Sequence, residues 1–234
     1  MPRHSKKIIL WRFDDVNITG TDTITPKIID IFNNYRQSAN FAVVLNPLNK
    51  LGPILRTAAQ HHQIMAHGPP HVSWTQLTIK QLQITVKTMR QRLDEARIPS
   101  TSFVFPGLHS TLRTYLFLRK YGFHTIAKGK RIWSFLDPVL SKIFRIKFVP
   151  YHHWSTEISY EPPKRKPANE YYSIINKSSH FIHIMDHVTL YTEKDLSFLN
   201  NFLRTASKTC TFVTYDAYLN ILANKNKNHH RVTQ

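Results

Sequence analysis

Short runs of consecutive apolar residues, typical of buried strands, alternate with segments in which apolar residues recur every three or four positions, as on one side of a helix. The runs predict strands at residues 8–13, 40–45, 63–66, 103–105, 124–127, 146–151, 171–175, 180–185 and 210–213. The recurring segments predict helices at residues 26–34, 51–61, 78–93, 111–121, 193–206 and 215–223. This alternation indicates an α/β protein with a mostly parallel sheet and helical crossovers.

The segment that begins at Thr78 has the clearest helix signals. Thr78 and Gln81 fit a capping box, in which the two side chains bond free backbone amides of the first turn. The residues that follow at helical spacing predict a stripe facing the core, formed by Ile79, Leu82, Val86, Met89 and Leu93. Thr192 is predicted to cap the helix at 193–206 in a similar way.

The length and the continuity of the pattern predict one domain. The chain has 234 residues, and α/β barrels often exceed 200 residues without dividing. No internal repeat or long linker interrupts the pattern, so we predict a single domain over residues 1–223. Residues 224–234 are polar and basic and have no periodicity, which predicts a disordered tail.

The formal net charge of +18, from 32 Lys and Arg against 14 Asp and Glu, is unusually high. Such a charge attracts polyanions: nucleic acid, an anionic membrane face, or an acidic or phosphate-bearing glycan. The alternative is a basic surface without a specific partner. The sequence has no recognisable nucleic-acid module, and with 6 Gly in the chain a phosphate-cradling loop is disfavoured.

The apolar runs are too short to cross a membrane, which takes roughly 18 uninterrupted apolar residues. The basic start of the chain leads into an apolar run that Arg12 and Asp14 interrupt, too early for a signal peptide. The single Cys210 excludes an internal disulfide and agrees with a reducing compartment. We therefore expect a cytoplasmic protein.

The first candidate functional residues are two adjacent acids, Asp14 and Asp15, directly after the first predicted strand. In α/β folds the carboxyl ends of the strands form the functional edge of the sheet. Adjacent residues of an extended chain point to opposite sides, so we expect one acid to face a metal and the other to take another role. Acids that only cap a loop are the alternative.

Two histidines, His67 and His71, follow the third predicted strand. Four residues apart, they can close on one cation, and Pro69 and Pro70 between them indicate a shaped turn rather than a helix. Two histidines and one carboxylate form an open triad that suits zinc or another divalent transition ion. In a chain with 14 His, however, two histidines at this spacing are weak evidence when taken alone.

The order of the motifs resembles that of the polysaccharide deacetylases of the NodB-homology type, also called carbohydrate esterase family 4. The resemblance covers about residues 8–222, and its motifs are Phe13-Asp14-Asp15, Asn40-Phe41-Ala42-Val43-Val44, His67-x-x-x-His71, Phe103-x-x-Pro106-Gly107, Ile182-His183 and Phe212-Val213-Thr214. It implies a distorted (β/α) barrel with the site at the carboxyl ends of the strands.

The resemblance also implies roles for individual residues. Asp14 would be the general base, and Asp15, His67 and His71 would hold the metal. Backbone amides near Gly107 and Leu108 would help to hold an oxyanion. The family's acid is a histidine on a late strand. His183 fits this place best and His187 is its competitor.

The sequence departs from the family at two places. The family has an Arg beside the Pro of its fourth motif, paired with the catalytic Asp, whereas Val104 and Phe105 stand here. We expect Arg12 to lie on the other face of its strand. The Asp that tunes the family's acidic histidine is not evident in 128–177, and Asp186 is the substitute that the chain offers. These departures put efficient hydrolysis in more doubt than metal binding.

Three further residues are weaker candidates for substrate binding. His109 follows the Pro-Gly motif, and a surface or capping role is its alternative. His153 and Trp154 follow a late strand, where an aromatic face can stack on a sugar ring, and a packed edge strand is as good an explanation.

Two functions therefore stand as hypotheses. The first is a metal-dependent hydrolase that removes an N-acyl group, acetyl or formyl, from an amino sugar or glycan precursor. Its ion would be zinc, with nickel, cobalt or manganese as alternatives. The second is a catalytically weakened or inactive barrel of the same fold that binds an anionic partner, either nucleic acid, a membrane surface or an acidic glycan. The oligomeric state stays open.

Overall fold

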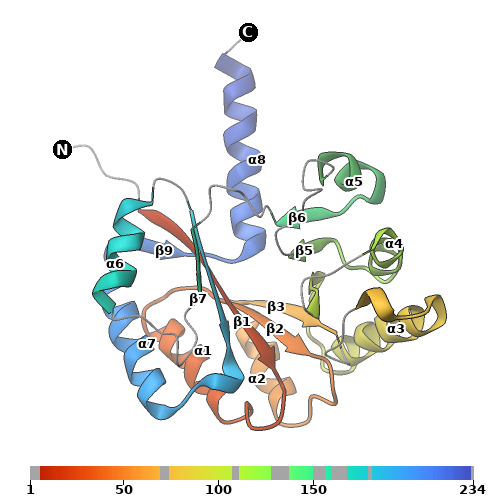
Figure 1. Cartoon of the computed structure of the whole chain (residues 1–234), viewed down its shortest axis with the longest axis horizontal. Helices are drawn as coiled ribbons and strands as arrows, with labels where there is room; N and C mark the ends of the chain where they lie inside the picture. The colour runs from red at the N-terminus through yellow and green to blue at the C-terminus, as the bar shows by residue number, and fades with distance from the viewer. Residues whose placement is uncertain are drawn as a thin grey trace.

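The computed structural model describes residues 6–68, 74–106, 111–127, 137–149, 156–159, 168–178 and 181–232. Its strands form one nine-stranded, curled sheet in the order β6-β5-β4-β3-β2-β1-β8-β7, with β9 paired to β1 (Figure 1). The pairings in the described residues are parallel throughout. The predicted α/β class with a mostly parallel sheet is therefore confirmed.

The strands follow the apolar runs closely. They are β1 Lys7–Val16, β2 Asn40–Val44, β3 Gln63–His67, β4 Ser102–Val104, β5 Thr125–Ala127, β6 Lys147–Val149, β7 Thr156–Ser159, β8 Ile182–His187 and β9 Cys210–Phe212. Every residue of β2 and β3 is buried, as expected for parallel strands covered on both faces. No apolar run predicted β7.

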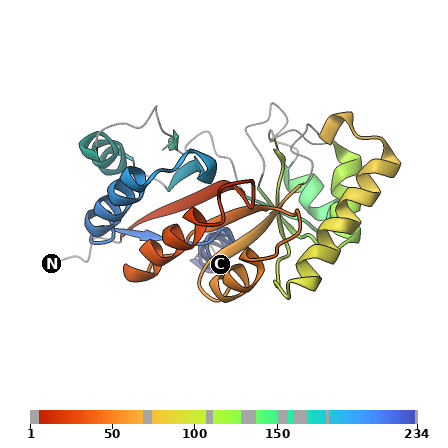
Figure 2. The same cartoon turned by 90° about the horizontal axis from the view of Figure 1, so that it is seen from below.

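The helices connect successive strands. They are α1 Ile24–Asn34, α2 Leu51–Ala58, α3 Ile79–Glu95, α4 Leu112–Lys120, α5 Asp137–Phe144, α6 Ala168–Lys177, α7 Glu193–Ala206 and α8 Tyr215–Val232, with short 3₁₀ helices η1 Trp74–Gln76 and η4 Val188–Leu190. Figure 2 shows α6 and α7 at one end of the molecule and α3 to α5 at the other.

The predicted helix caps are confirmed. The Gln81 amide donates to the Thr78 hydroxyl at 3.3 Å, and the Thr78 amide donates to the Gln81 side chain at 2.9 Å. Thr192 forms a similar box with Asp195. Of the predicted stripe on α3, the buried members are Leu82, Val86, Met89 and Leu93. Ile79 is 52% exposed, so the core covers the stripe only from the second turn onward.

Two predictions for the second half of the chain are wrong. Residues 171–175, predicted as a strand, belong to helix α6. Tyr171 and Ile175 are buried four residues apart, which is the spacing of one helix face. Helix α8 continues to Val232, through most of the predicted disordered tail, and projects from the body in Figure 1. Once its first turns are formed, a helix gains one hydrogen bond with each added residue, even without an apolar stripe.

The two faces of the sheet bury separate sets of side chains. The outer face packs against the helices and includes Ile9, Trp11 and Phe13 of β1. The inner face holds a smaller cluster with Leu10 of β1, closed by Tyr215 and Tyr218 of α8. Because side chains alternate along a strand, residues 10, 12 and 14 of β1 share the inner face. This face carries the polar residues of the site.

Within the part of the chain that the structure describes, no helix is both long and apolar enough to cross a membrane.

Candidate active site

One extra residue in β1 places the two acids. Arg12 and Phe13 pair with Asn40 and Phe41 of β2, but the next pair is Val16 with Val43, three steps along β1 against two along β2. This irregularity is a β-bulge, and Asp15 in it has a φ of 63°. The bulge interrupts the strict alternation from which we expected the acids to diverge. Both acids are buried at the carboxyl end of β1.

His67, the last residue of β3, faces Asp15. Its Nε2 lies 3.5 Å from the Asp15 carboxylate, and its Nδ1 lies 3.1 Å from the carbonyl oxygen of Val104. A carbonyl only accepts, so in the neutral ring Nδ1 carries the proton and Nε2 presents its lone pair to Asp15. A histidine oriented in this way by a backbone carbonyl is typical of metal ligands.

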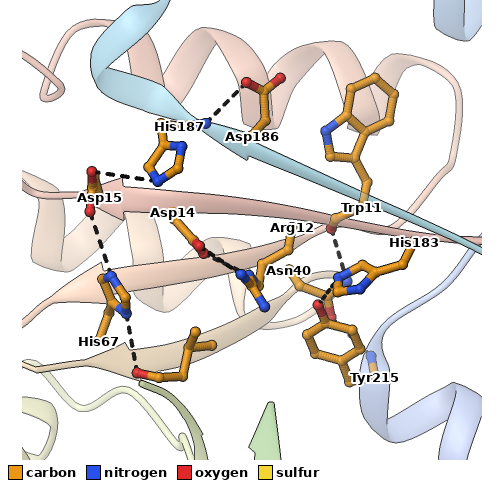
Figure 3. Close-up of polar contacts among 11 residues, drawn as sticks. Trp11, Arg12, Asp14, Asp15, Asn40, His67, His183, Asp186, His187 and Tyr215 are labelled. Carbon is orange, nitrogen blue, oxygen red and sulfur yellow. Dashed lines mark hydrogen bonds and ion pairs between the residues drawn. The ribbon is translucent and has the colours of Figure 1, made fainter. Parts of the chain in front are cut away.

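His187, the last residue of β8, completes the group shown in Figure 3. It is level with Asp14 in the pairing of β1 with β8, and its Nε2 lies 4.0 Å from Asp15 Oδ2. The backbone N–H of His187 donates to Asp186 at 3.0 Å, and the Tyr191 hydroxyl donates to the second Asp186 oxygen. The ends of β1, β3 and β8 thus bring four candidate side chains together: Asp14, Asp15, His67 and His187.

His183 lies elsewhere on β8. It is level with Leu10, four residues below the position of His187 and therefore about 13 Å away along the strand. Its imidazole is buried and bonded to the Tyr215 hydroxyl. Burial, with the positive charge of Arg12, lowers its pKa to about 3. Of the two histidines considered as the acid, the structure brings His187 next to Asp15.

Arg12 is the site residue that we misplaced from the sequence. Its Nε and Nη2 donate to the two oxygens of Asp14, both at 2.7 Å (Figure 3). Burial alone would raise the pKa of Asp14, but the attraction of Arg12, supported by these bonds and by His67, outweighs burial and lowers it. The period of two along a strand already puts residues 12 and 14 on one face. This spacing alone was enough to predict that Arg12 and Asp14 lie side by side.

The remaining candidates lie outside the described residues: His71, Gly107, Leu108, His109, His153 and Trp154. Among the residues that are described, no group of three or more His, Cys, Asp or Glu side chains is arranged to hold a metal ion. Asp15 and His67 supply two donors of the right kind, a carboxylate oxygen and an oriented imidazole nitrogen. The two described donors, Asp15 and His67, therefore fit a divalent ion.

A cavity of about 370 Å³ lies near the starts of β3 and β4, away from these strand ends. Gln63, Ser102 and Asp216 line it, and their side chains bond one another there. It is separate from the candidate site.

Solved structures with the same fold include a deacetylase, an esterase and a pseudoenzyme. A peptidoglycan deacetylase from Bacillus subtilis has a TM-score of 0.64, with 14% identity over 98% of both chains. A family 4 acetyl xylan esterase from Clostridium thermocellum, in complex with a cobalt ion, has a TM-score of 0.61, with 15% identity over 92% of this chain and 91% of that one. A mutant of a family 4 pseudoenzyme with restored activity has a TM-score of 0.57, with 10% identity over 89% of this chain and 65% of that one.

At these identities the structures show the fold alone, and they confirm the barrel type expected from the motifs. No protein of curated function matches the sequence. The sequence model of the polysaccharide deacetylases matches residues 2–126, which is more than half of the 234 residues. This match covers β1 to β4, most of β5, and the three strand-end residues Asp14, Asp15 and His67. The chain therefore belongs to the polysaccharide deacetylase family.

Proposed function

We propose that this protein is a metal-dependent hydrolase that removes an N-acyl group, acetyl or formyl, from an amino sugar or glycan precursor. The observation that carries the proposal is the convergence of Asp14, Asp15, His67 and His187 at the ends of three strands, in a member of this family. The carboxyl ends of the strands are where α/β barrels place their chemistry. The high positive charge suits a phosphate-bearing or acidic substrate.

Asp14 is the general base in this proposal. Its lowered pKa keeps the carboxylate ionised at neutral pH, ready to accept the proton of an attacking water. A carboxylate with a low pKa is a weak base, so the water must be made more acidic. A divalent ion, held by Asp15, His67 and His71, would polarise the acyl carbonyl and acidify the water when bound. The lowered pKa of Asp14 thus favours a metal-dependent reaction over one by the carboxylate alone.

His187 is the acid in this proposal, in place of His183. An acid must reach the departing amine in order to protonate it. His187 is partly exposed and stands beside Asp15, whereas His183 is buried below Arg12 and bonded to Tyr215. Backbone amides near Gly107 and Leu108 stay in the proposal as oxyanion donors, and His109, His153 and Trp154 stay as substrate contacts.

The test is acetate release from N-acetylglucosamine oligomers, with the metal content of each protein measured in parallel. Asp14→Asn should retain the metal and lose activity by roughly 100-fold or more, because the base is removed while Asp15 and His67 remain. Asp30→Asn makes the same chemical change at an exposed position of α1 and should be fully active. An inactive wild-type protein with its metal bound, or a fully active Asp14→Asn, would rule the proposal out.

A second candidate function is the binding of an anionic partner by a barrel without activity. The net charge of +18 favours it. Binding of DNA or anionic vesicles that weakens steeply with salt, and that Asp14→Asn and Asp15→Ala leave unchanged, would support this function. It would do so only if the wild-type protein releases no acetate.

A further inference from the structure

Arg12 holds the carboxylate of Asp14 at two points. The fork from Nε and Nη2 to the two Asp14 oxygens is a bidentate contact, which fixes the plane of the carboxylate as well as its position. Arg12 is 1% exposed and Asp14 is 4% exposed. Each carboxylate oxygen has a second lone pair, so the fork leaves acceptor capacity for a water molecule.

A buried ion pair of this kind contributes little net stability to a fold. Removing two charges from water offsets most of their attraction, and apolar residues of similar volume often serve as well. The arrangement does supply a defined orientation, because the Arg12 fork fits a carboxylate in one geometry. The contact is therefore better explained by the placement of Asp14 than by the stabilisation of β1.

Tyr215 and His183 lie near Arg12, close enough to interact electrostatically with its guanidinium. The Tyr215 hydroxyl and Nε2 of His183 share a hydrogen bond. Burial lowers the pKa of His183, so its neutral ring can accept the tyrosine proton. Figure 3 shows both contacts, that of Arg12 with Asp14 and that of Tyr215 with His183.

Asn40 links Tyr215 to the sheet. The backbone N–H of Tyr215, at the start of α8, donates to Asn40 Oδ1 at 2.9 Å. Asn40 Nδ2 donates to the carbonyl oxygen of Trp11, also at 2.9 Å. Asn40 and Tyr215 are completely buried. The residues around Arg12 therefore come from β1, β2, β8 and α8 together.

We propose that Arg12 is a positioning residue for catalysis: it aims the Asp14 carboxylate through its two-point contact. The inference rests on the proposed function, since it needs Asp14 to be the base. His183 is bonded to Tyr215 and does not take the acid role that the motif order implied.

Two substitutions test the inference, Arg12→Met and Arg12→Lys. Lysine keeps the charge and lacks the fork. For both variants we expect kcat to fall by roughly 10- to 100-fold and KM to change by less than about 2-fold. The metal content should not change, because the fork engages Asp14 rather than Asp15. Arg113→Lys, the same change at an exposed position of α4, is the matched control and should behave as wild type.

The decisive comparison places Arg12→Lys in the Asp14→Asn background. If Arg12 acts through Asp14, the second substitution causes no further loss of kcat. This comparison also serves if Arg12→Met does not fold, because Lys retains the buried charge. An Arg12→Lys protein with wild-type kcat, or an equal loss of kcat in both backgrounds, would overturn the inference and leave the proposed hydrolase intact. An inactive wild-type protein with bound metal would remove both.

Discussion

Asp14 and Asp15 are neighbours in the chain, yet they have different partners. The reason is the β-bulge, which interrupts the pairing of β1 with β2 at these two residues. Asp14 faces down the strand to Arg12, and Asp15 faces across the sheet to His67 and His187. The positive φ of Asp15 is uncommon for a residue other than glycine, although Asp and Asn tolerate it better than most. Local backbone strain of this kind gathers at functional sites. The division of labour between the two acids therefore has a backbone origin.

The sequence predicted some site residues and misplaced others for identifiable reasons. The motif order pointed to Asp14, Asp15 and His67, because each directly follows a clear apolar run. The choice between His183 and His187 depends on where β8 ends, and periodicity does not fix the end of a strand to within two residues. The pairing of β8 with β1 places His187 at the level of Asp14. Only this register shows which of the two histidines, His183 or His187, lies beside the acids.

Two buried histidines make the stability depend on pH. Burial lowers the pKa of His183, with help from Arg12, to about 3, and burial with the neighbouring His61 lowers that of His62 to about 4. The unfolded chain takes up these protons near pH 6.5, well before the folded protein does. Protons therefore favour unfolding below pH 6.5, until each folded pKa is reached.

We accordingly expect the free energy of unfolding to fall by about 1.4 kcal/mol per pH unit for each histidine below pH 6.5. The contribution of His62 should end near pH 4 and that of His183 near pH 3. Urea unfolding at a series of pH values measures the slope. His62→Gln and His183→Gln should each remove the part of the slope that the replaced histidine contributes. Equal free energies of unfolding at pH 7 and pH 5 would contradict the assignment.

At the scale of elements, local signals predicted helix starts better than they predicted element type. The boxes at Thr78 and Thr192 depend on side chains three residues apart, which the sequence displays directly. Residues 171–175 were predicted as a strand because a short apolar run does not distinguish a strand from a buried helix face. Burial at Tyr171 and Ile175 resolves it in favour of the helix.

Thr78→Ala should lower the free energy of unfolding by about 1 kcal/mol, because the first turn of α3 loses its cap. Thr57→Ala is the matched control, since it makes the same change at an exposed position inside α2. Alanine has the higher helix propensity there, so this control should be neutral or slightly stabilising. Denaturant unfolding of the two variants decides the point. Equal losses of stability would show that the cap contributes nothing beyond the threonine side chain itself.

At the scale of the molecule, the alternation of strand and helix fixed the fold class, and the order of motifs fixed the type of barrel. The strand order in the sheet is set by long-range packing, which no local window reports. Helix α8 shows the same limit, because its residues Tyr215 and Tyr218 are buried against the inner face of a sheet built from distant parts of the chain. A periodicity within 215–223 predicted the helix without predicting which face it closes.

Truncation after Ala223 should leave the fold and activity intact. The α8 side chains that contribute to the inner cluster in the described structure are Tyr215, Tyr218, Leu219 and Leu222. We expect the free energy of unfolding to change by less than about 0.5 kcal/mol, as for other changes outside the core. Urea unfolding and acetate release measure the two properties. A loss of several kcal/mol would show that the end of α8 packs against the body.

The central claim is that Asp15, His67 and His71 share one divalent ion beside Asp14. Anomalous X-ray scattering from crystals loaded with zinc or cobalt tests it most directly. We expect one strong peak about 2.0–2.2 Å from a carboxylate oxygen of Asp15 and from ring nitrogens of His67 and His71. A metal-loaded crystal with its ion bound elsewhere, or with no peak between Asp15 and His67, would contradict the account.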